Sequence, residues 1–160
     1  MIRAAVKRLV RSIYVMRCGY CLVSEAEVGA EMTYDHFQPQ SQGGSNDQEN
    51  LVYACHACNE FKGDYFGDTE DTRLLHPLHD DLKHHLGHRL DGTLQGVTPA
   101  GQRYIERLQL NRPPLVLYRR NGQRAEQSIE RYQAINARLE QIMVRVQRIE
   151  EKSRSRKRRR

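Results

Sequence analysis

The cysteines of this chain constrain its fold more than any other feature, because all four fall into two pairs of identical spacing. Two residues separate Cys18 from Cys21, two separate Cys55 from Cys58, and 33 residues lie between the pairs. A two-residue gap lets both thiolates of a pair reach one ion, and two pairs supply the four ligands of a tetrahedral zinc site. Four unrelated thiols, or a redox motif, would not explain why the pair occurs twice. We therefore expect a structural zinc that joins two distant segments.

The apolar content of the chain is low. Hydrophobic residues make up 38% of the 160 residues, which is little material for a large core. Such chains usually need a metal, a disulfide or a partner for stability, and the cysteine pairs offer the metal. No apolar run approaches the roughly 18 residues of a membrane span, and arginines interrupt residues 1–20, where a signal peptide would have its apolar core. We expect a cytoplasmic protein without a membrane segment.

The net charge of +6 is concentrated at the two ends of the chain. Residues 152–160 carry seven basic residues and no acid, and without them 19 basic residues stand against 20 acidic ones, a net charge of −1. Residues 1–24 hold five basic residues and no acid. Basic ends on a balanced body favour a polyanionic partner, above all nucleic acid; a merely solvated tail is the alternative. The candidate contacts near the N-terminus are Arg3, Lys7 and Arg11.

Four expected elements surround the cysteine pairs. Apolar residues at helical spacing predict an amphipathic, basic helix over 2–16. Alternating and aromatic residues predict strands at 31–37 and 51–54, with a polar, glycine-containing loop between them. A short helix is expected over 58–65. This order of strand, loop, strand and helix, with a cysteine pair at each end, predicts an α+β fold.

The second half of the chain is expected to be mainly helical. Residues 82–96 indicate a hairpin or a helical turn, and Thr98-Pro99 is typical of a helix start, here of a helix running to about Asn111. Pro113-Pro114 then interrupts it. A last long helix carries apolar residues at alternating three- and four-residue steps: Tyr132, Ile135, Leu139, Ile142, Val146 and Ile149. This seam predicts either packing on the same domain or a coiled coil through 129–149 with a second copy or another protein.

Residues between and beside the cysteine pairs form a recognisable series of motifs. In chain order they are Asp35-His36-Phe37-x-Pro39, Gly43-Gly44-Ser45, Asn50-Leu51 and Cys55-x2-Cys58-Asn59-x2-Lys62-Gly63. The segment from Arg17 to Asp64 thereby resembles the HNH endonuclease family in its zinc-bound form. The resemblance implies a ββα-metal finger and the hydrolysis of DNA phosphodiester bonds to a 5′-phosphate and a 3′-hydroxyl.

The resemblance also implies a role for each polar residue of these motifs. His36 would be the general base that activates water, which suits a side chain that accepts a proton near neutral pH. Asp35 and Asn59 would hold one divalent metal at the scissile phosphate. Asn50 would tie the loop so that His36 is correctly aimed. Lys62, one helical turn beyond Asn59, is a candidate phosphate contact.

The ligand set predicts which metal supports activity. Asn59 stands where many relatives have a second histidine, so the metal would meet carboxylate, amide and water oxygens and no imidazole. Hard oxygen ligands favour Mg²⁺ or Mn²⁺ over a catalytic zinc. Three alternatives stay open: Asn59 as a helix cap, a non-catalytic zinc module that binds nucleic acid or a protein, and an enzyme that cuts RNA.

These features divide the chain into four parts. They are a nuclease core at 1–66, an accessory extension packed on it at 67–120, a long helix at 121–151 and a basic disordered tail at 152–160. The extension contains a histidine-rich stretch that is either a second metal site or part of the shell around the core: His76, His79, His84, His85 and His88.

Overall fold

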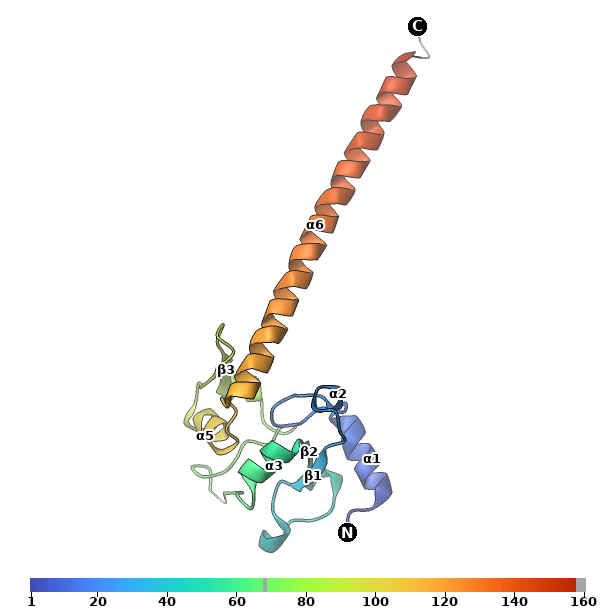
Figure 1. Cartoon of the computed structure of the whole chain (residues 1–160). Helices are drawn as coiled ribbons and strands as arrows, with labels where there is room; N and C mark the ends of the chain where they lie inside the picture. The colour runs from blue at the N-terminus through green and yellow to red at the C-terminus, as the bar shows by residue number, and fades with distance from the viewer. Residues whose placement is uncertain (68, 158–160) are drawn as a thin grey trace. The chain divides into compact units, whose positions relative to one another are not determined.

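The computed structural model describes residues 1–67 and 69–157, and the chain divides into two compact units, Met1–Arg119 and Arg120–Arg160. The helices are α1 (Ala4–Ile13), α2 (Glu25–Val28), α3 (His56–Lys62), α4 (Leu82–His85), α5 (Pro99–Arg107) and α6 (Pro113–Lys157), and short 3-10 helices span Gln40–Gln42 and Gln48–Asn50 (Figure 1). The strands are β1 (Thr33–His36), β2 (Leu51–Ala54), β3 (Leu86–His88) and β4 (Leu94–Gly96). This mixture of helices and small antiparallel sheets confirms the predicted α+β class.

Strands β1 and β2 form the hairpin that positions the candidate site. They pair antiparallel, with Asp35 opposite Val52 and His36 opposite Leu51. All four residues of β2 are buried, which explains why this strand reads as a continuous apolar run rather than an alternating one. Helix α3 begins immediately after β2 with Cys55 as its N-cap. The hairpin and α3 together make the predicted ββα arrangement.

Helix α1 covers the hairpin and is shorter than predicted. Val10 and Tyr14 are buried in the core, and the helix contacts β2. The expected range was 2–16, but the helix ends at Ile13 because Val15 and Met16 adopt left-handed backbone conformations, with φ of 51° and 54°. These two residues turn the chain toward the first cysteine pair.

The extension shares one buried core with the finger. Tyr104, Leu108 and Leu110 belong to the same buried cluster as β2 and the cysteines, and the ring centroid of Tyr104 lies 6.4 Å from that of Tyr20. Unit Met1–Arg119 therefore stabilises its small hairpin with apolar residues drawn from far along the chain.

The start of α5 is as predicted, and its end is not. The Thr98 hydroxyl accepts a hydrogen bond from the Gly101 amide at 3.1 Å, and Pro99 takes the first helical position. The helix ends at Arg107 rather than near Asn111, because Gln109 adopts a left-handed conformation with φ of 47°.

Helix α6 replaces the disordered tail that was expected at the C-terminus. It continues to Lys157, so the expectation of disorder is wrong for 152–157, while residues 158–160 lie outside the described part of the chain. Within residues 1–67 and 69–157, no helix combines the length and the apolar character needed to cross a bilayer.

Candidate metal centre and active site

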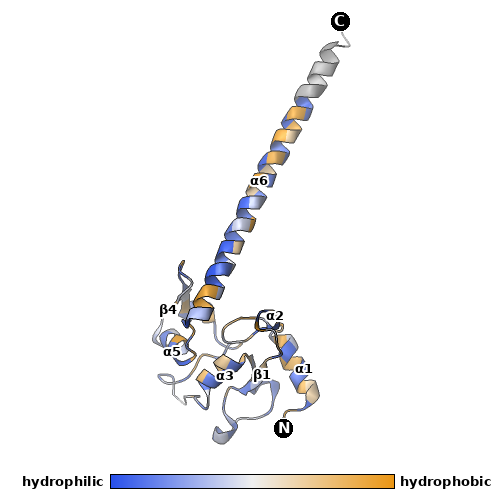
Figure 2. Ribbon diagram, in the orientation of Figure 1, coloured by the Kyte–Doolittle hydropathy of each residue, from blue (hydrophilic) through white to orange (hydrophobic). Residues whose placement is uncertain are grey.

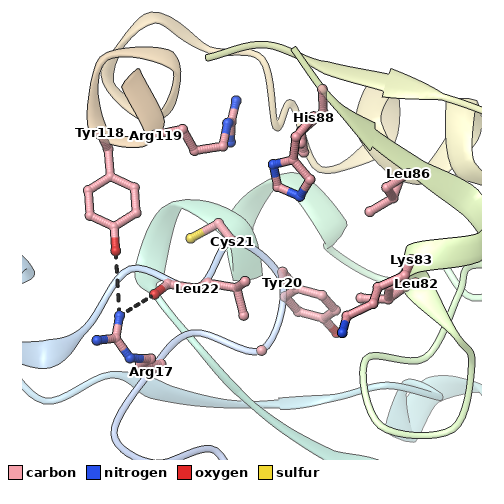
Figure 3. Close-up of a pocket in the computed structure, with 12 residues that line it drawn as sticks. Arg17, Tyr20, Cys21, Leu22, Leu82, Lys83, Leu86, His88, Tyr118 and Arg119 are labelled. Atoms are coloured by element: carbon pink, nitrogen blue, oxygen red, sulfur yellow. Dashed lines mark hydrogen bonds between the residues drawn. The ribbon is translucent and has the colours of Figure 1, made fainter. Parts of the chain in front are cut away.

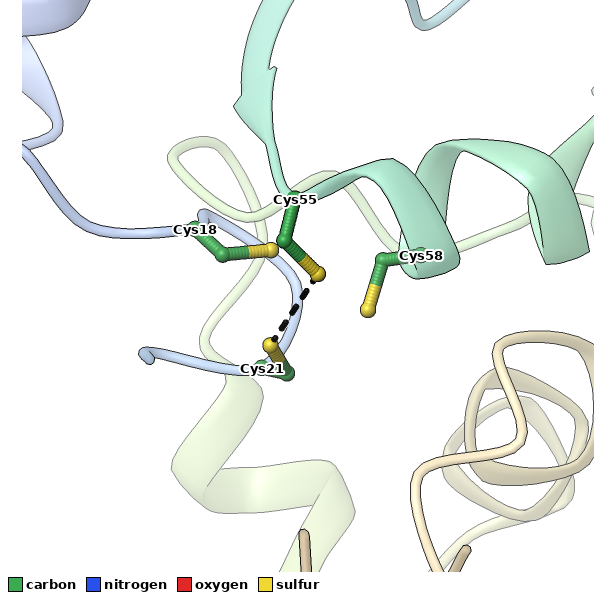
Figure 4. A group of neighbouring side chains, drawn as sticks. All are labelled: Cys18, Cys21, Cys55 and Cys58. Carbon is green, nitrogen blue, oxygen red and sulfur yellow. Dashed lines mark hydrogen bonds between the residues drawn. The ribbon is translucent and has the colours of Figure 1, made fainter. Parts of the chain in front are cut away.

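The four cysteines come together as predicted. Their Sγ atoms all lie within 4.8 Å of one another and all four side chains are buried, and Figure 4 shows one pair on the loop after α1 and the other at the start of α3. The Sγ atoms of Cys21 and Cys55 are 3.8 Å apart. Tetrahedral zinc with Zn–S bonds of about 2.3 Å sets its sulfurs about 3.8 Å from one another. The cluster is thus positioned to bind a metal, and its donor set suggests zinc.

The backbone around the first pair is shaped for this role. The Cys18 amide donates to the Val23 carbonyl at 2.9 Å, and the Leu22 amide donates to the Cys18 carbonyl at 2.8 Å, which closes a tight knuckle. Gly19 packs so closely that an added Cβ would lie 2.4 Å from the Tyr14 ring. A side chain there would have to displace the side chains of Tyr14 and Val52, so close packing favours glycine.

One residue beside the sulfur cluster was missed by the sequence analysis. The Nη2 atom of Arg112 lies 3.3 Å from Cys58 Sγ and 3.9 Å from Cys55 Sγ. Its guanidinium also lies over the ring of Phe61, 5.4 Å from the centroid. Four thiolates around a divalent cation carry a net charge of −2, which Arg112 partly neutralises. No local signal identifies this arginine, because it follows Cys58 by more than 50 residues.

Three of the four predicted catalytic residues line a single open pocket, and Asn50 lies outside its lining. Asp35 and His36 reach it from β1 and Asn59 reaches it from α3, and its volume is about 340 Å³. The remaining lining residues are Tyr34, Pro39, Gln40, Ser41, Gly63 and Asp64. Neighbouring strand residues normally face opposite sides. Here the second one lies at the end of β1, where the strand enters the loop, and both contribute to the pocket.

The Asp35 carboxylate is buried and held at both oxygens. Oδ1 accepts a hydrogen bond from Lys62 Nζ at 3.1 Å, and Oδ2 accepts one from the Tyr20 hydroxyl. Burial raises the pKa of Asp35 above its usual range, against the opposing effects of Lys62 and Tyr20. An ionised carboxylate offers about four lone-pair sites, so Asp35 retains capacity for a metal ion on the pocket side. The residues present therefore fit a divalent cation bound by oxygen atoms.

Lys62 does not have the role that the sequence predicted. Its side chain has no exposed surface, and Nζ donates to the His36 carbonyl at 2.8 Å and the Gly63 carbonyl at 3.3 Å in addition to Asp35. Burial lowers its pKa, while the neighbouring carboxylate opposes that effect. The prediction of a phosphate contact is wrong, because this ammonium group is enclosed by the protein. Lys62 instead fixes Asp35 and the end of β1.

His36 is oriented by a residue of the polar loop. Its Nε2 atom lies 2.9 Å from Asn46 Oδ1. An amide oxygen only accepts hydrogen bonds, so this contact assigns the proton to Nε2 and leaves Nδ1 as the basic nitrogen of a neutral ring. Asn46 follows the Gly43-Gly44-Ser45 motif in the sequence. Its position directly after this motif is the sequence feature that could have identified Asn46 as a partner of His36.

Asn50 ties the loop to the hairpin. Its Oδ1 accepts from the Gln38 amide at 2.8 Å, while Nδ2 donates to the Gln38 carbonyl at 3.0 Å and to the Ser45 carbonyl at 2.9 Å. Gly44 lies against the same strand end, where an added Cβ would come within 1.7 Å of the Gln38 oxygen. These contacts hold the loop that carries Asn46, the residue bonded to His36.

Asn59 does not cap a helix. It lies inside α3, whose N-cap is Cys55, and its backbone N–H donates to the Cys55 carbonyl at 3.0 Å. The alternative interpretation of Asn59 as a capping residue is therefore excluded, and its side chain lines the pocket.

The basic residues of α1 differ in what they contact. Arg3 and Lys7 are exposed, and Lys7 Nζ lies 5.4 Å from the centroid of the Tyr34 ring, which also lines the Asp35 pocket. Arg11 instead donates to both carboxylate oxygens of Glu25, at 2.6 and 2.5 Å, and this contact lowers the pKa of Glu25 to about 2. Arg11 thus forms an ion pair between α1 and α2, and its contact with nucleic acid stays a prediction.

One residue of the histidine-rich stretch, His76, packs into the protein interior. His76 is buried, stacks on His79 with ring centroids 4.1 Å apart, and meets the edge of Phe37 at 4.5 Å. Asp80 accepts hydrogen bonds from Arg73 at 2.9 and 3.0 Å. Among the described residues, the four cysteines are the group whose ligand atoms cluster closely enough for a metal.

A second, larger cavity of about 560 Å³ lies beside the first cysteine pair (Figure 3). Its lining is mainly apolar and includes Tyr20, Leu22, Leu82, Leu86 and Leu94. It shares no residue with the Asp35 pocket and its lining contains no carboxylate. The smaller pocket therefore carries the candidate chemistry.

Comparison with known proteins supports this interpretation. The family model of the HNH endonuclease matches residues 18–64, which include both cysteine pairs and all of the predicted catalytic residues. No curated protein and no solved structure matches the chain. Residues 18–64 thus match the HNH endonuclease family, and the clustering of their four cysteines fits a zinc-binding member of it.

Proposed function

We propose that this chain hydrolyses phosphodiester bonds of DNA, with His36 as the general base and Asp35 and Asn59 as ligands of a divalent metal. The observation that carries the proposal is the convergence of these three side chains on one open pocket inside an HNH domain. The match to the HNH endonuclease family supports nuclease activity. The shared pocket supports the roles assigned to His36, Asp35 and Asn59.

The chain supplies the base and its orientation. His36 is half-buried and bonded through Nε2 to Asn46, so Nδ1 can take a proton from water. General bases work when their geometry is fixed within hydrogen-bond reach of the reacting water. Asn50 holds the loop that carries Asn46, which makes it a positioning residue for His36.

The chain also supplies the ligands of the proposed catalytic metal. Asp35 is fixed by Lys62 and the Tyr20 hydroxyl, and Asn59 is fixed by its place in α3. A bound divalent cation would stabilise the charge that develops on the phosphate and on the leaving 3′ oxygen. Carboxylate and amide oxygens favour Mg²⁺ or Mn²⁺ for this role. The four cysteines, which leave no open position, hold a structural zinc.

The exposed basic residues support a nucleic-acid substrate. Lys7 and Arg8 lie on α1 and Arg3 is its N-cap residue, and Lys7 contacts the Tyr34 ring that lines the pocket. Such contacts give sequence-independent affinity that falls with added salt. Cysteines that bind zinc must stay reduced, which favours a reducing compartment such as the cytoplasm.

Cleavage assays with defined metals test this function. The purified chain, with its structural zinc retained and other metals removed, is incubated with plasmid DNA and with RNA. We expect DNA cleavage with Mg²⁺ or Mn²⁺, weak support by added Zn²⁺ and products that carry 5′-phosphates. DNA that is bound but uncut under every metal condition would favour a non-catalytic zinc module. Cleavage confined to RNA would establish the other alternative.

A further inference from the structure

Helix α6 carries a regular series of exposed apolar residues in the unit Arg120–Arg160. Figure 2 shows hydrophobic colouring recurring along this helix between hydrophilic stretches. Single exposed apolar residues are common on protein surfaces, whereas a contiguous series of them marks an interaction surface. Those on this helix are between 47% and 70% exposed: Tyr132, Ile135, Leu139, Ile142 and Val146. A surface of this kind indicates a contact that the single chain does not make.

The spacing of these residues identifies the kind of contact. The steps alternate between three and four residues, which is the 3.5-residue period of a two-stranded coiled coil rather than the 3.6-residue period of a helix on a globular core. In heptad notation, position a is occupied by Tyr132, Leu139 and Val146. Position d is occupied by Ile135 and Ile142.

Arginines run along one flank of this seam. Every g position over four heptads is an arginine, namely Arg124, Arg131, Arg138 and Arg145. The residues on the opposite flank, at position e, are Ile129, Asn136 and Met143, none of which is charged. All seven side chains are exposed.

The arginine flank determines which orientation of two copies is acceptable. In an antiparallel pair, g positions face g positions, so arginines would stand opposite arginines along the whole seam. In a parallel pair, each g position faces the e position of the next heptad, so Arg124 meets Ile129, and Arg138 meets Met143. Arginine stems cover apolar surface well while the guanidinium stays in water. The charge pattern thus opposes antiparallel pairing and permits parallel pairing.

We propose that residues 124–148 pair with the same segment of a second copy of this chain as a parallel, in-register coiled coil. A second copy covers both flanks at once, because the arginines of each helix cover Ile129 and Met143 of the other. An acidic helix from a different protein could also face the arginines and is the competing occupant. Each assembly then contains two HNH domains. The inference does not depend on their catalytic activity.

The oligomeric mass of the full chain tests the pairing. Lysines introduced at two d positions (Ile135→Lys with Ile142→Lys) should convert dimers to monomers in sedimentation equilibrium. The matched control places the same two charges on the outer face, at f positions, with Ala137→Lys and Val144→Lys, and should stay dimeric. Bound zinc, measured in each sample, reports whether the HNH domain is intact.

A single cysteine tests the orientation. Ser128 occupies a d position, so in a parallel, in-register pair two Ser128→Cys residues meet and form a disulfide on mild oxidation, which requires Cα atoms within about 7 Å. Glu130→Cys, on the outer face, is the control and should not cross-link. A wild-type chain that is monomeric at every concentration would overturn the proposal in favour of another partner. A dimer without the Ser128→Cys cross-link, or a mass of three or more chains, would also overturn it.

Discussion

The ammonium group of Lys62 lies 3.1 Å from Oδ1 of Asp35, and both side chains are buried. The pair joins the last residue of α3 to β1, so it fixes the helix that carries Asn59 against the strand that carries Asp35 and His36. The buried ion pair therefore contributes directly to the relative placement of the proposed base and the proposed metal ligands.

Replacing Lys62 by methionine should destabilise the protein strongly. Methionine keeps much of the volume but leaves the Asp35 carboxylate buried without its charged partner, which typically costs roughly 3–5 kcal/mol. Urea denaturation with zinc present measures this change in the free energy of unfolding. Lys83→Met is the matched control, since Lys83 is exposed, and its effect should stay within about 0.5 kcal/mol. Equal effects of the two substitutions would show that the buried pair contributes nothing specific.

Replacing Arg112 by glutamine should weaken zinc binding. The guanidinium lies 3.3 Å from Cys58 Sγ, and loss of a group that contacts a metal ligand typically lowers metal affinity by about 10–100-fold. Competition with a chromogenic chelator measures the affinity. Arg8→Gln, on the exposed surface of α1, removes the same charge away from the cluster and should leave zinc affinity unchanged. Retention of wild-type affinity by Arg112→Gln would exclude a role in the metal centre.

Stability should fall as the pH drops from about 6.5 toward 4. Burial lowers the pKa of His76 to about 4, with a smaller contribution from His79, although Asp80 opposes both effects. The unfolded chain therefore binds a proton at this histidine before the folded chain does, so the contribution to stability is complete above its ordinary pKa of 6.5 and is lost on acidification. Urea midpoints between pH 7.5 and about 5 should depend less on pH in His76→Phe.

A second histidine provides the control for this pH dependence. His56 is exposed, so His56→Phe should retain the wild-type change of urea midpoint with pH. If His76→Phe and the wild type show the same change, His76 does not titrate between the folded and unfolded states as described.

Local sequence patterns predicted those features whose determinants lie close together in the chain. The two-residue gap in each cysteine pair fixes where the thiolates point, and Thr98-Pro99 contains a complete helix start, so the sulfur cluster and the start of α5 were predicted correctly. The strand positions followed from alternation and from the apolar run of β2.

Contacts between distant residues account for what the sequence did not predict. Lys62 was interpreted as a phosphate ligand because the sequence places it one helical turn beyond Asn59. Its burial against Asp35 depends on how α3 packs on β1, which the local sequence does not show. Arg11 was interpreted as a nucleic-acid contact for a similar reason, since its partner Glu25 belongs to another helix. Arg112 reaches the sulfur cluster only through the fold of the extension.

The most direct measurement of the central claim is the single-turnover rate of DNA cleavage by His36→Ala in Mg²⁺. The account predicts a loss of about 10²–10⁴-fold, the usual contribution of a general base, with DNA binding and zinc content unchanged. His56→Ala, a histidine substitution between Cys55 and Cys58, should cleave at the wild-type rate. Wild-type cleavage by His36→Ala would contradict the assignment of His36 as the base and the catalytic role proposed for its pocket.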